Sequence, residues 1–170
     1  LYQEARPENI AFIKGELKDE IGERLKGATV EIKNAKTKEK TDVVIDSLTG
    51  EYMAVISLKK KDDIIITVKK DGYAFNSQVI AIKDSVTSKP IKVNFDVKPV
   101  MIGEAYTLNN IYYATNSSEL KEESKIVIDE FVDFLKAYPN VKIEIHGHTD
   151  NVGDDNSNLT LSNDRASAVY

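Results

Sequence analysis

Residues 147–169 read GHTDNVGDDNSNLTLSNDRASAV, and this stretch is the most informative part of the chain. A polar loop containing Gly153 leads into a run whose apolar residues Leu161, Ala168 and Val169 favour a helix over residues 158–170. Asp150 lies in the loop and Arg165 on the helix. In a strand-loop-helix unit, two such side chains can meet over the carboxyl end of the strand, where folds of this kind bind ligands.

The residues before this stretch predict a strand, a helix and a further strand. VKIEIHG (141–147) alternates in the manner of a strand, with Val141, Ile143 and Ile145 on one face. ELKEESKIVIDEFVDFLKAYPN (119–140) has the spacing of an amphipathic helix, with apolar residues at Val127, Phe131, Leu135 and Tyr138. AYTLNNIYYATN (105–116) predicts an earlier strand, closed by a turn at Asn116 and Ser117. The order is β-α-β-α.

Residues 10–98 predict a different module, built from short strands alone. GATVEI (27–32), SLTGEYMAVISL (47–58) and KPIKVNFDV (89–97) each place alternate apolar residues on one face. Gly50 and the pair Asp71-Gly72 are turn signals, and Gly50 is expected to take a positive φ. Recurring turns between strands favour a small β-sandwich.

The composition supports two modules and excludes several classes of function. Of 170 residues, 41% are hydrophobic and 30% charged, as in globular proteins, and the net charge of −5 argues against nucleic acid as a partner. Residues 1–100 carry 18 Lys/Arg against 16 Asp/Glu, and residues 101–170 carry 5 against 12. The absence of cysteine excludes disulfides, thiolate metal sites and cysteine nucleophiles.

Two histidines beside the aspartate raise the possibility of a metal site. His146-x-His148-x-Asp150 resembles the start of the metallo-β-lactamase signature, but Asn151 stands where that family has a further histidine. The chain has no third histidine, and Gly147 and the following loop disfavour convergence of the three side chains. We therefore expect no metal and no cofactor.

The alternative interpretation concerns Asp150 and Arg165. A carboxylate and a guanidinium that face one pocket suit a zwitterion, because the carboxylate binds an ammonium and the guanidinium binds a carboxylate through two hydrogen bonds. A structural interpretation stays open at this point, in which the two side chains simply pair with each other.

The same stretch resembles the OmpA-like C-terminal domain. That family's signature is TD, ten residues, LS, two residues, RA, two residues and V; it occurs here as Thr149-Asp150, Leu161-Ser162, Arg165-Ala166 and Val169. NNIYYATNSSELKEES (109–124) is similar to the family's first strand and the approach to its first helix.

The resemblance implies non-covalent binding of peptidoglycan through the amino-acid end of diaminopimelate in the stem peptide. By position, Asp150 would bind the ammonium and Arg165 the carboxylate, and Asn116 and Asn158 would be further ligand-binding residues. It also implies a periplasmic protein, associated with the outer membrane of a Gram-negative bacterium. The partners would be peptidoglycan and other outer-membrane or secretion-system proteins. Because the family's domain continues with another strand-helix-strand, we expect residues 104–170 to be its front part, with apolar faces incompletely covered.

The first half has a resemblance of its own. GELKDEIGERLKGATVEI (15–32), DSLTGEYMAVI (46–56) and VKKDGY (68–73) are similar to the carboxypeptidase regulatory-like domain, a transthyretin-like sandwich. Together the two modules resemble cell-envelope proteins of the PorE type.

The predicted fold class is thus α+β, in four segments. They are an N-terminal tail (1–9), the sandwich (10–98), a linker (99–103) and an OmpA-like domain (104–170). The predicted function is anchoring of an outer-membrane protein or secretion assembly to the cell wall, without catalysis. Two alternatives are an assembly domain that binds no ligand and a metal-dependent hydrolase.

Overall fold

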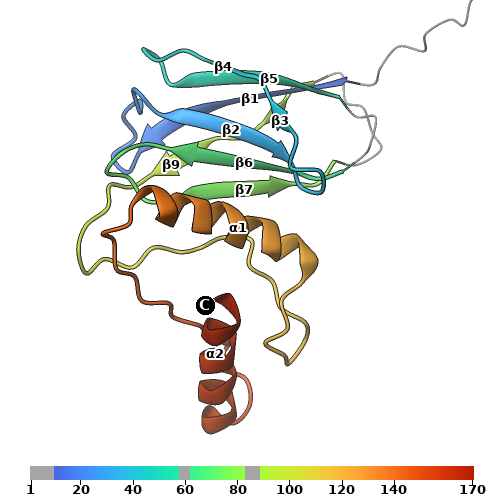
Figure 1. Ribbon diagram of the computed structural model, residues 1–170, viewed down its shortest axis with the longest axis vertical. Helices are drawn as coiled ribbons and strands as arrows, with labels where there is room; N and C mark the ends of the chain where they lie inside the picture. Colours follow the sequence, from blue (N-terminus) through green and yellow to red (C-terminus); the bar gives the residue numbers. More distant parts are fainter. Residues whose placement is uncertain (1–9, 58–61, 83–88) are drawn as a thin grey trace, which may run out of the picture. The chain divides into compact units, whose positions relative to one another are not determined.

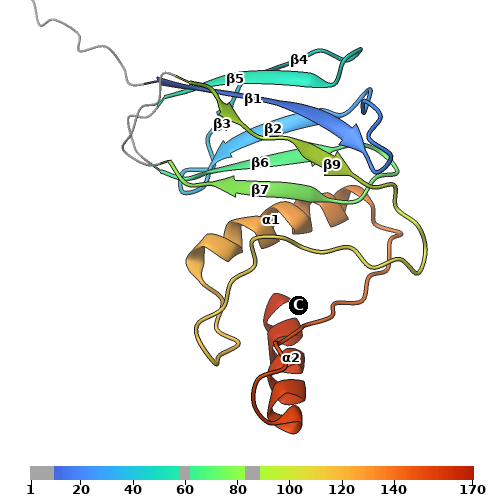
Figure 2. The same ribbon diagram turned by 180° about the vertical axis from the view of Figure 1, so that it is seen from behind.

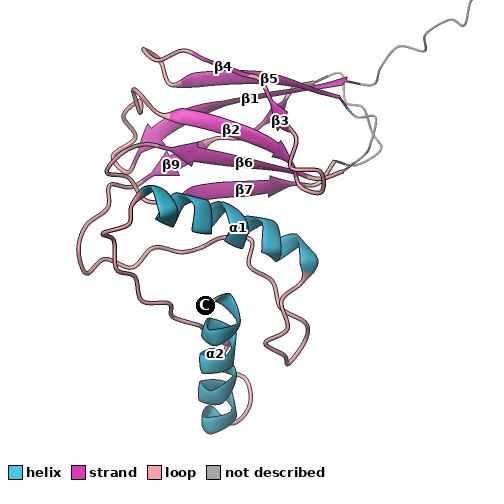
Figure 3. Ribbon diagram, in the orientation of Figure 1, coloured by secondary structure: helices cyan, strands magenta, loops and turns pink. Residues whose placement is uncertain are grey.

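The computed structural model describes residues 10–57, 62–82 and 89–170. The predicted tail (1–9) and Leu58 lie outside these residues. Within them the chain divides into two compact units, residues 1–109 and 110–170. Strands fill the first unit and helices the second, as Figure 3 shows by colour. The α+β class is confirmed. No helix among the described residues is both long and apolar enough to cross a membrane.

Nine strands form two sheets in the first unit (Figure 1). The first sheet has the order β4-β5-β1-β8, and β9 also pairs with β1; the second has the order β3-β2-β6-β7. The strands are β1 Ile10–Asp19, β2 Thr29–Asn34, β3 Lys40–Thr41, β4 Val43–Ile45, β5 Glu51–Ser57, β6 Ile64–Lys69, β7 Asn76–Ile80, β8 Ile91–Lys92 and β9 Phe95–Val97. β8 and β9 run parallel to β1, and the other pairs are antiparallel.

The core of this unit consists of the apolar faces that the alternation predicted. β5 shows the rule most clearly, since Tyr52, Ala54 and Ile56 are buried and the residues between them are exposed. Burial of one face of each strand fixes its register, because a slip of one residue would turn that face outward. The largest contributors to the core are Ile13, Leu17, Ile32, Tyr52, Ile56, Ile66, Val68, Phe95 and Val97.

Gly15 allows the backbone at Val93 to approach β1 closely. Gly15 lies opposite Tyr52 in the pairing of β1 with β5, and a Cβ at Gly15 would lie 1.7 Å from the carbonyl oxygen of Val93. The Tyr52 hydroxyl donates to the same oxygen at 2.6 Å. The predicted strand 89–97 is divided into β8 and β9, and Figure 2 shows β9 from behind. Gly50 has φ +68, as predicted.

The second unit contains two helices, α1 Glu122–Ala137 and α2 Asp155–Val169. Both were predicted, and α2 begins three residues earlier than expected because Asp154 caps it: its carboxylate accepts from the Ser157 backbone N–H at 2.9 Å. In α1, Val127 is fully buried and Phe131 is half-buried.

The predictions of two strands in this part of the chain are wrong. No strand is present over residues 105–116 or 141–147, and the β-α-β-α order is therefore not observed. In the first segment, Tyr113 forms an isolated antiparallel bridge with Leu120. Val141 and Ile143, expected on a buried face with Ile145, are exposed, because a strand needs a partner to which its N–H and C=O groups bond.

The boundary between the two units follows Asn109, whereas the second domain was predicted from residue 104. Residues after the sandwich bond back to it: the Val100 N–H donates to the Gly72 carbonyl at 2.8 Å, and the Tyr106 hydroxyl donates to the Pro99 carbonyl at 2.8 Å. These contacts explain why residues 99–106 belong to the first unit.

Candidate functional site

Arg165, on the third turn of α2, connects two loops of the second unit. Its Nε donates to the carbonyl oxygen of Ser117 at 3.2 Å, and its Nη1 donates to the carbonyl oxygen of His148 at 3.3 Å. Ser117 directly follows Asn116, and His148 lies two residues before Asp150. One guanidinium thus fixes the two segments that carry two of the predicted ligand-binding residues.

Tyr113 supports this guanidinium from a third direction. The Cζ of Arg165 lies 5.0 Å from the centre of the Tyr113 ring, a distance at which the cation is attracted to the ring face. The Tyr113 hydroxyl donates to the backbone carbonyl of Arg165 at 2.9 Å. Burial raises the pKa of Tyr113, and the charge of Arg165 opposes this only in part. The phenol therefore stays protonated at neutral pH and keeps its role as a donor.

A close contact between backbones brings the His148 carbonyl within reach of α2. A Cβ on Gly147 would lie 2.0 Å from the carbonyl oxygen of Ser162 and 3.0 Å from the backbone nitrogen of Ala166. Only glycine permits the chain to cross the helix at this distance. The small residues at Ser162 and Ala166 leave the surface of the helix open for that crossing.

Asp150 and Asn158 belong to a loop with its own hydrogen bonds. The Asp150 Oδ1 accepts from the Val152 N–H at 3.2 Å, and the Asn158 Nδ2 donates to the Val152 carbonyl at 3.0 Å. Asp154 closes the loop as the cap of α2, and its bonds from Ser157 hold the pKa of Asp154 below its usual value. The Asp150 carboxylate is exposed, with one oxygen used by the loop.

Asn116 lies at the tip of the turn that the sequence predicted. Its φ of +52 is in the left-handed region, which asparagine tolerates better than most residues. The Ala114 N–H donates to the Glu119 carbonyl at 2.9 Å, and the Glu119 N–H donates to the Ser117 hydroxyl at 2.9 Å. These bonds hold the exposed Asn116 beside the Ser117 carbonyl to which Arg165 is bound.

The structural interpretation, in which Asp150 and Arg165 pair with each other, is not what the structure shows. Among the described residues, the bonds of Arg165 go to backbone carbonyls, and the bond of Asp150 comes from Val152. An arginine has five N–H donors, and the two carbonyls take one on Nε and one on Nη1. The donors that remain are one on Nη1 and two on Nη2.

The metal interpretation also finds no geometric support in the described part of the chain. No group of three His, Cys, Asp or Glu side chains there is placed to hold a metal ion. The His146 Nε2 lies 3.4 Å from a Glu144 carboxylate oxygen, with 64% of the His146 side chain exposed. His148 contributes its backbone carbonyl to Arg165.

Four residues of this site could not be found by searching for chemical groups. Ser117 and His148 act through backbone carbonyls, which every residue type possesses. Tyr113 resembled a strand residue, and Gly147 a strand exit. Gly147 is the one signal that was available in the sequence, because glycine permits a close approach between backbones.

The comparison with protein families identifies the second unit. The model of the OmpA family matches residues 112–170, which include every residue of the site described above. The resemblance of residues 12–82 to the carboxypeptidase regulatory-like domain stays a prediction.

Two of the curated relatives are named as outer-membrane proteins. Outer membrane porin F of Pseudomonas aeruginosa is 33% identical over 88 residues, which are 51% of this chain and 25% of the porin. Outer membrane protein Omp38 of Acinetobacter baumannii is 39% identical over 59 residues, which are 35% of this chain and 17% of that protein. The matched part of the chain thus spans a quarter or less of the length of either relative.

Solved structures resemble the chain only weakly. A phospholipase of Legionella pneumophila aligns with 66% of this chain and 30% of its own, at 12% identity and a TM-score of 0.41. A likeness of this size supports no inference about function.

Proposed function

Because residues 112–170 carry an OmpA family domain, we propose that this chain binds peptidoglycan by holding the diaminopimelate residue of its stem peptide. Asp150 binds the ammonium of that residue, and Arg165 binds the carboxylate. Asn116 and Asn158 supply neutral hydrogen bonds. Binding takes place in the periplasm and anchors an outer-membrane protein or a secretion assembly to the cell wall.

The observation that carries this proposal is that the bonds of Asp150 and Arg165 go to other groups and not to each other. Arg165 is held by two carbonyls rather than by Asp150, so both charges stay available to a ligand. A ligand that carries an ammonium and a carboxylate on one carbon matches such a pair, because each charge gains a charge-assisted hydrogen bond. A simple anion or cation would satisfy only one of them.

Asn116 and Asn158 fit the same interpretation in different ways. Asn116 is exposed at a turn tip and fixed by its neighbours. Asn158 already donates from Nδ2 to Val152, so the oxygen Oδ1 is the atom that it offers to an ammonium or amide donor. Val152 uses both backbone groups within the loop, which leaves its exposed side chain for contact.

We also propose that the chain is a binding protein and not an enzyme. The two relatives described above are named as outer-membrane proteins, one of them a porin. The chain lacks cysteine, and its two histidines, His146 and His148, lie in the segment that precedes Asp150. Holding a zwitterion requires neither a nucleophile nor a general base.

Sedimentation with purified sacculi that contain diaminopimelate tests this proposal. The 170-residue chain should pellet with the sacculi, and Asp150→Ala, Arg165→Ala and the double variant should stay in the supernatant. His146→Ala is the matched control, since His146 is an exposed neighbour on the same segment, and it should pellet as the wild type does. A folded double variant that still pellets fully would contradict the roles of Asp150 and Arg165, and a wild type that stays in the supernatant is the result expected of an assembly domain that binds no ligand.

A further inference from the structure

We infer that Tyr113 is a positioning residue: its ring and hydroxyl direct the outer end of the Arg165 guanidinium toward the ligand and so set selectivity for a carboxylate over a carboxamide. This inference rests on the proposed function. Tyr113 is outside the set of residues predicted to touch the ligand.

The two carbonyl bonds decide which edge of Arg165 a ligand can reach. A carboxylate can approach a guanidinium along the side formed by Nε and one Nη, or end-on between the two Nη atoms. Here the Nε–H is bound to the Ser117 carbonyl at 3.2 Å. The side approach is therefore taken by the protein, so a carboxylate that makes two parallel bonds must do so end-on, with the free N–H of Nη1 and one N–H of Nη2.

The ring of Tyr113 limits the remaining freedom of the guanidinium. The planar cation lies over the ring at 5.0 Å, and rotation about the side chain would break this contact together with one carbonyl bond. The Tyr113 hydroxyl is bound to the Arg165 backbone carbonyl at 2.9 Å, so ring and helix keep their spacing. A side chain with several rotatable bonds is thereby restricted to one direction before the ligand arrives.

The position of Tyr113 is itself fixed by the start of α1. The hydroxyl of the buried Ser124 accepts from the Tyr112 N–H at 2.7 Å and donates to the Tyr112 carbonyl at 3.1 Å. The Lys121 N–H donates to the same carbonyl at 3.0 Å. The backbone before Tyr113 is thus tied to α1, and Tyr113 connects this helix to Arg165 on α2.

Directional holding matters most for telling a carboxylate from a carboxamide. A carboxylate offers two oxygen acceptors to the two N–H groups of the end-on edge, whereas a carboxamide offers one oxygen and turns an NH₂ donor toward a donor. A guanidinium whose edge is fixed in direction cannot rotate to avoid this contact between two donors. A guanidinium free to rotate can bond the amide oxygen alone and lose part of its selectivity.

The test compares two probes on four proteins. The probes are a stem tripeptide ending in meso-diaminopimelate and the same peptide with the carboxyl that faces Arg165 converted to the amide. The proteins are the wild type, Tyr113→Leu, Tyr113→Phe and the matched control Tyr112→Leu, which removes an exposed neighbouring ring. Calorimetric titration gives the ratio of the two dissociation constants for each protein.

The wild type and Tyr112→Leu should favour the free carboxylate by the same ratio. Tyr113→Leu should reduce this ratio about 3- to 30-fold, the range expected for a cation–ring contact. Tyr113→Phe keeps the ring and should stay within about 3-fold of the wild type. An unchanged ratio in Tyr113→Leu would overturn the inference, and so would an equal loss of affinity for both probes, which is the result of a merely structural role.

A second readout needs no ligand. In the free wild-type protein, the Arg165 Nε–H, identified by its absence in Arg165→Lys, should give a separate NMR signal protected from exchange with water. An exposed, fast-exchanging Nε–H would overturn the inference. If the signal is protected but the wild type binds neither peptide, the proposed function fails while the bond that holds Arg165 to the Ser117 carbonyl stands.

Discussion

At the scale of single residues, Arg165 combines recognition with construction of the site. Its bonds to Ser117 and His148 hold together two loops that are distant in sequence. Truncation of Arg165 therefore removes a ligand contact and also releases the segments that carry Asn116 and Asp150. The effect of Arg165→Ala on binding should exceed that of a single lost hydrogen bond for this reason.

Gly147 offers a steric test of the site. Its φ is not in the left-handed region, so Gly147→Ala introduces no backbone strain, only a Cβ 2.0 Å from the Ser162 carbonyl oxygen. We predict a loss of stability of about 1–3 kcal/mol, as for other overpacked contacts, because α2 must move away. Affinity for the stem peptide should fall at least about 10-fold, since the Arg165–His148 bond stretches with it.

Urea unfolding and peptide titration measure the two effects of Gly147→Ala. Ser167→Ala, at an exposed position of α2, is the control and should change neither quantity. Wild-type stability and affinity in Gly147→Ala would show that the backbone does not cross the helix as closely as described.

The sequence predicted some of these residues and could not predict others. Asp150, Asn116, Asn158 and Arg165 were expected because their charges, amides and spacing match a family pattern. The carbonyl bonds of Arg165 were not, since a backbone acceptor leaves no trace in residue identity.

At the scale of elements, alternation of apolar residues was a reliable guide where strands pair and an unreliable one where they do not. β2 and β5 bury the faces that were expected, because each lies between two neighbours and above a core. Residues 141–147 show the same alternation without a ladder. Val141 and Ile143 are also exposed there, since a strand and its buried face both require a partner that the local sequence does not specify.

An ion cluster on β2 predicts how the stability of the sandwich depends on pH. Glu31 lies 2.9 Å from the Lys69 Nζ and 3.2 Å from the Lys40 Nζ. Burial raises the pKa of Glu31, but the bonds from the two lysines outweigh it and bring the pKa to about 2. A carboxyl whose pKa is lower in the folded state stabilises the protein at pH values above its ordinary pKa of 4.5. This contribution is lost as the pH falls from 4.5 toward 2.

We predict that Glu31→Gln lowers the free energy of unfolding by about 1 kcal/mol at pH 7, a value reduced for partial exposure to solvent. The difference between wild type and variant should shrink steadily between pH 4.5 and 2. Urea unfolding at several pH values measures it, with Glu20→Gln, at an exposed turn position, as the control. A difference that stays constant across this range would refute the role of the cluster.

At the scale of the whole molecule, the chain consists of two units with separate architectures. We propose that residues 10–98 are an independent domain. The core of the sandwich is contained within these residues, and both sheets are complete in them. The task of this unit cannot be read from the sequence, because a spacer and an interaction module need the same buried faces and differ only in what lies against their outer surface.

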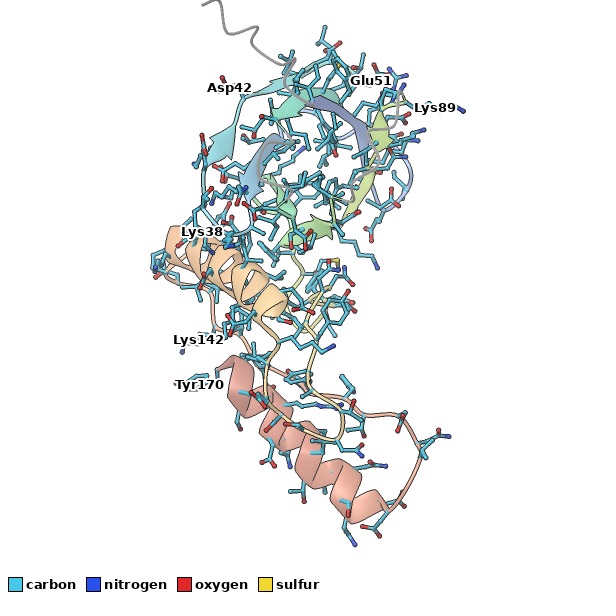
Figure 4. The ribbon with its side chains drawn as sticks, turned by 90° about the vertical axis from the view of Figure 1, so that its right-hand side faces the viewer. Lys38, Asp42, Glu51, Lys89, Lys142 and Tyr170 are labelled. Carbon is cyan, nitrogen blue, oxygen red and sulfur yellow. The ribbon has the colours of Figure 1, made fainter. Side chains whose placement is uncertain are left out.

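The fragment 10–98 tests this division. It should give a far-UV circular dichroism spectrum dominated by strands and a single cooperative thermal transition. Figure 4 shows Lys142 and Tyr170 of the second unit extending away from the ribbon, and the fragment omits both residues. A helical spectrum, or a transition without cooperativity, would mean that residues 10–98 do not fold alone.

The central claim is that Asp150 and Arg165 together hold one zwitterion, and a calorimetric double-mutant cycle tests it most directly. The ligand is a stem tripeptide ending in meso-diaminopimelate, titrated into the wild type, Asp150→Ala, Arg165→Ala and the double variant, each first shown to be folded. Each single variant should lose roughly 2–4 kcal/mol, or about 30- to 1000-fold in affinity, because a charge-assisted bond is lost and a ligand charge is left unpaired. The double variant should lose less than the sum, since both residues hold one group. Wild-type affinity in the folded double variant would contradict the claim.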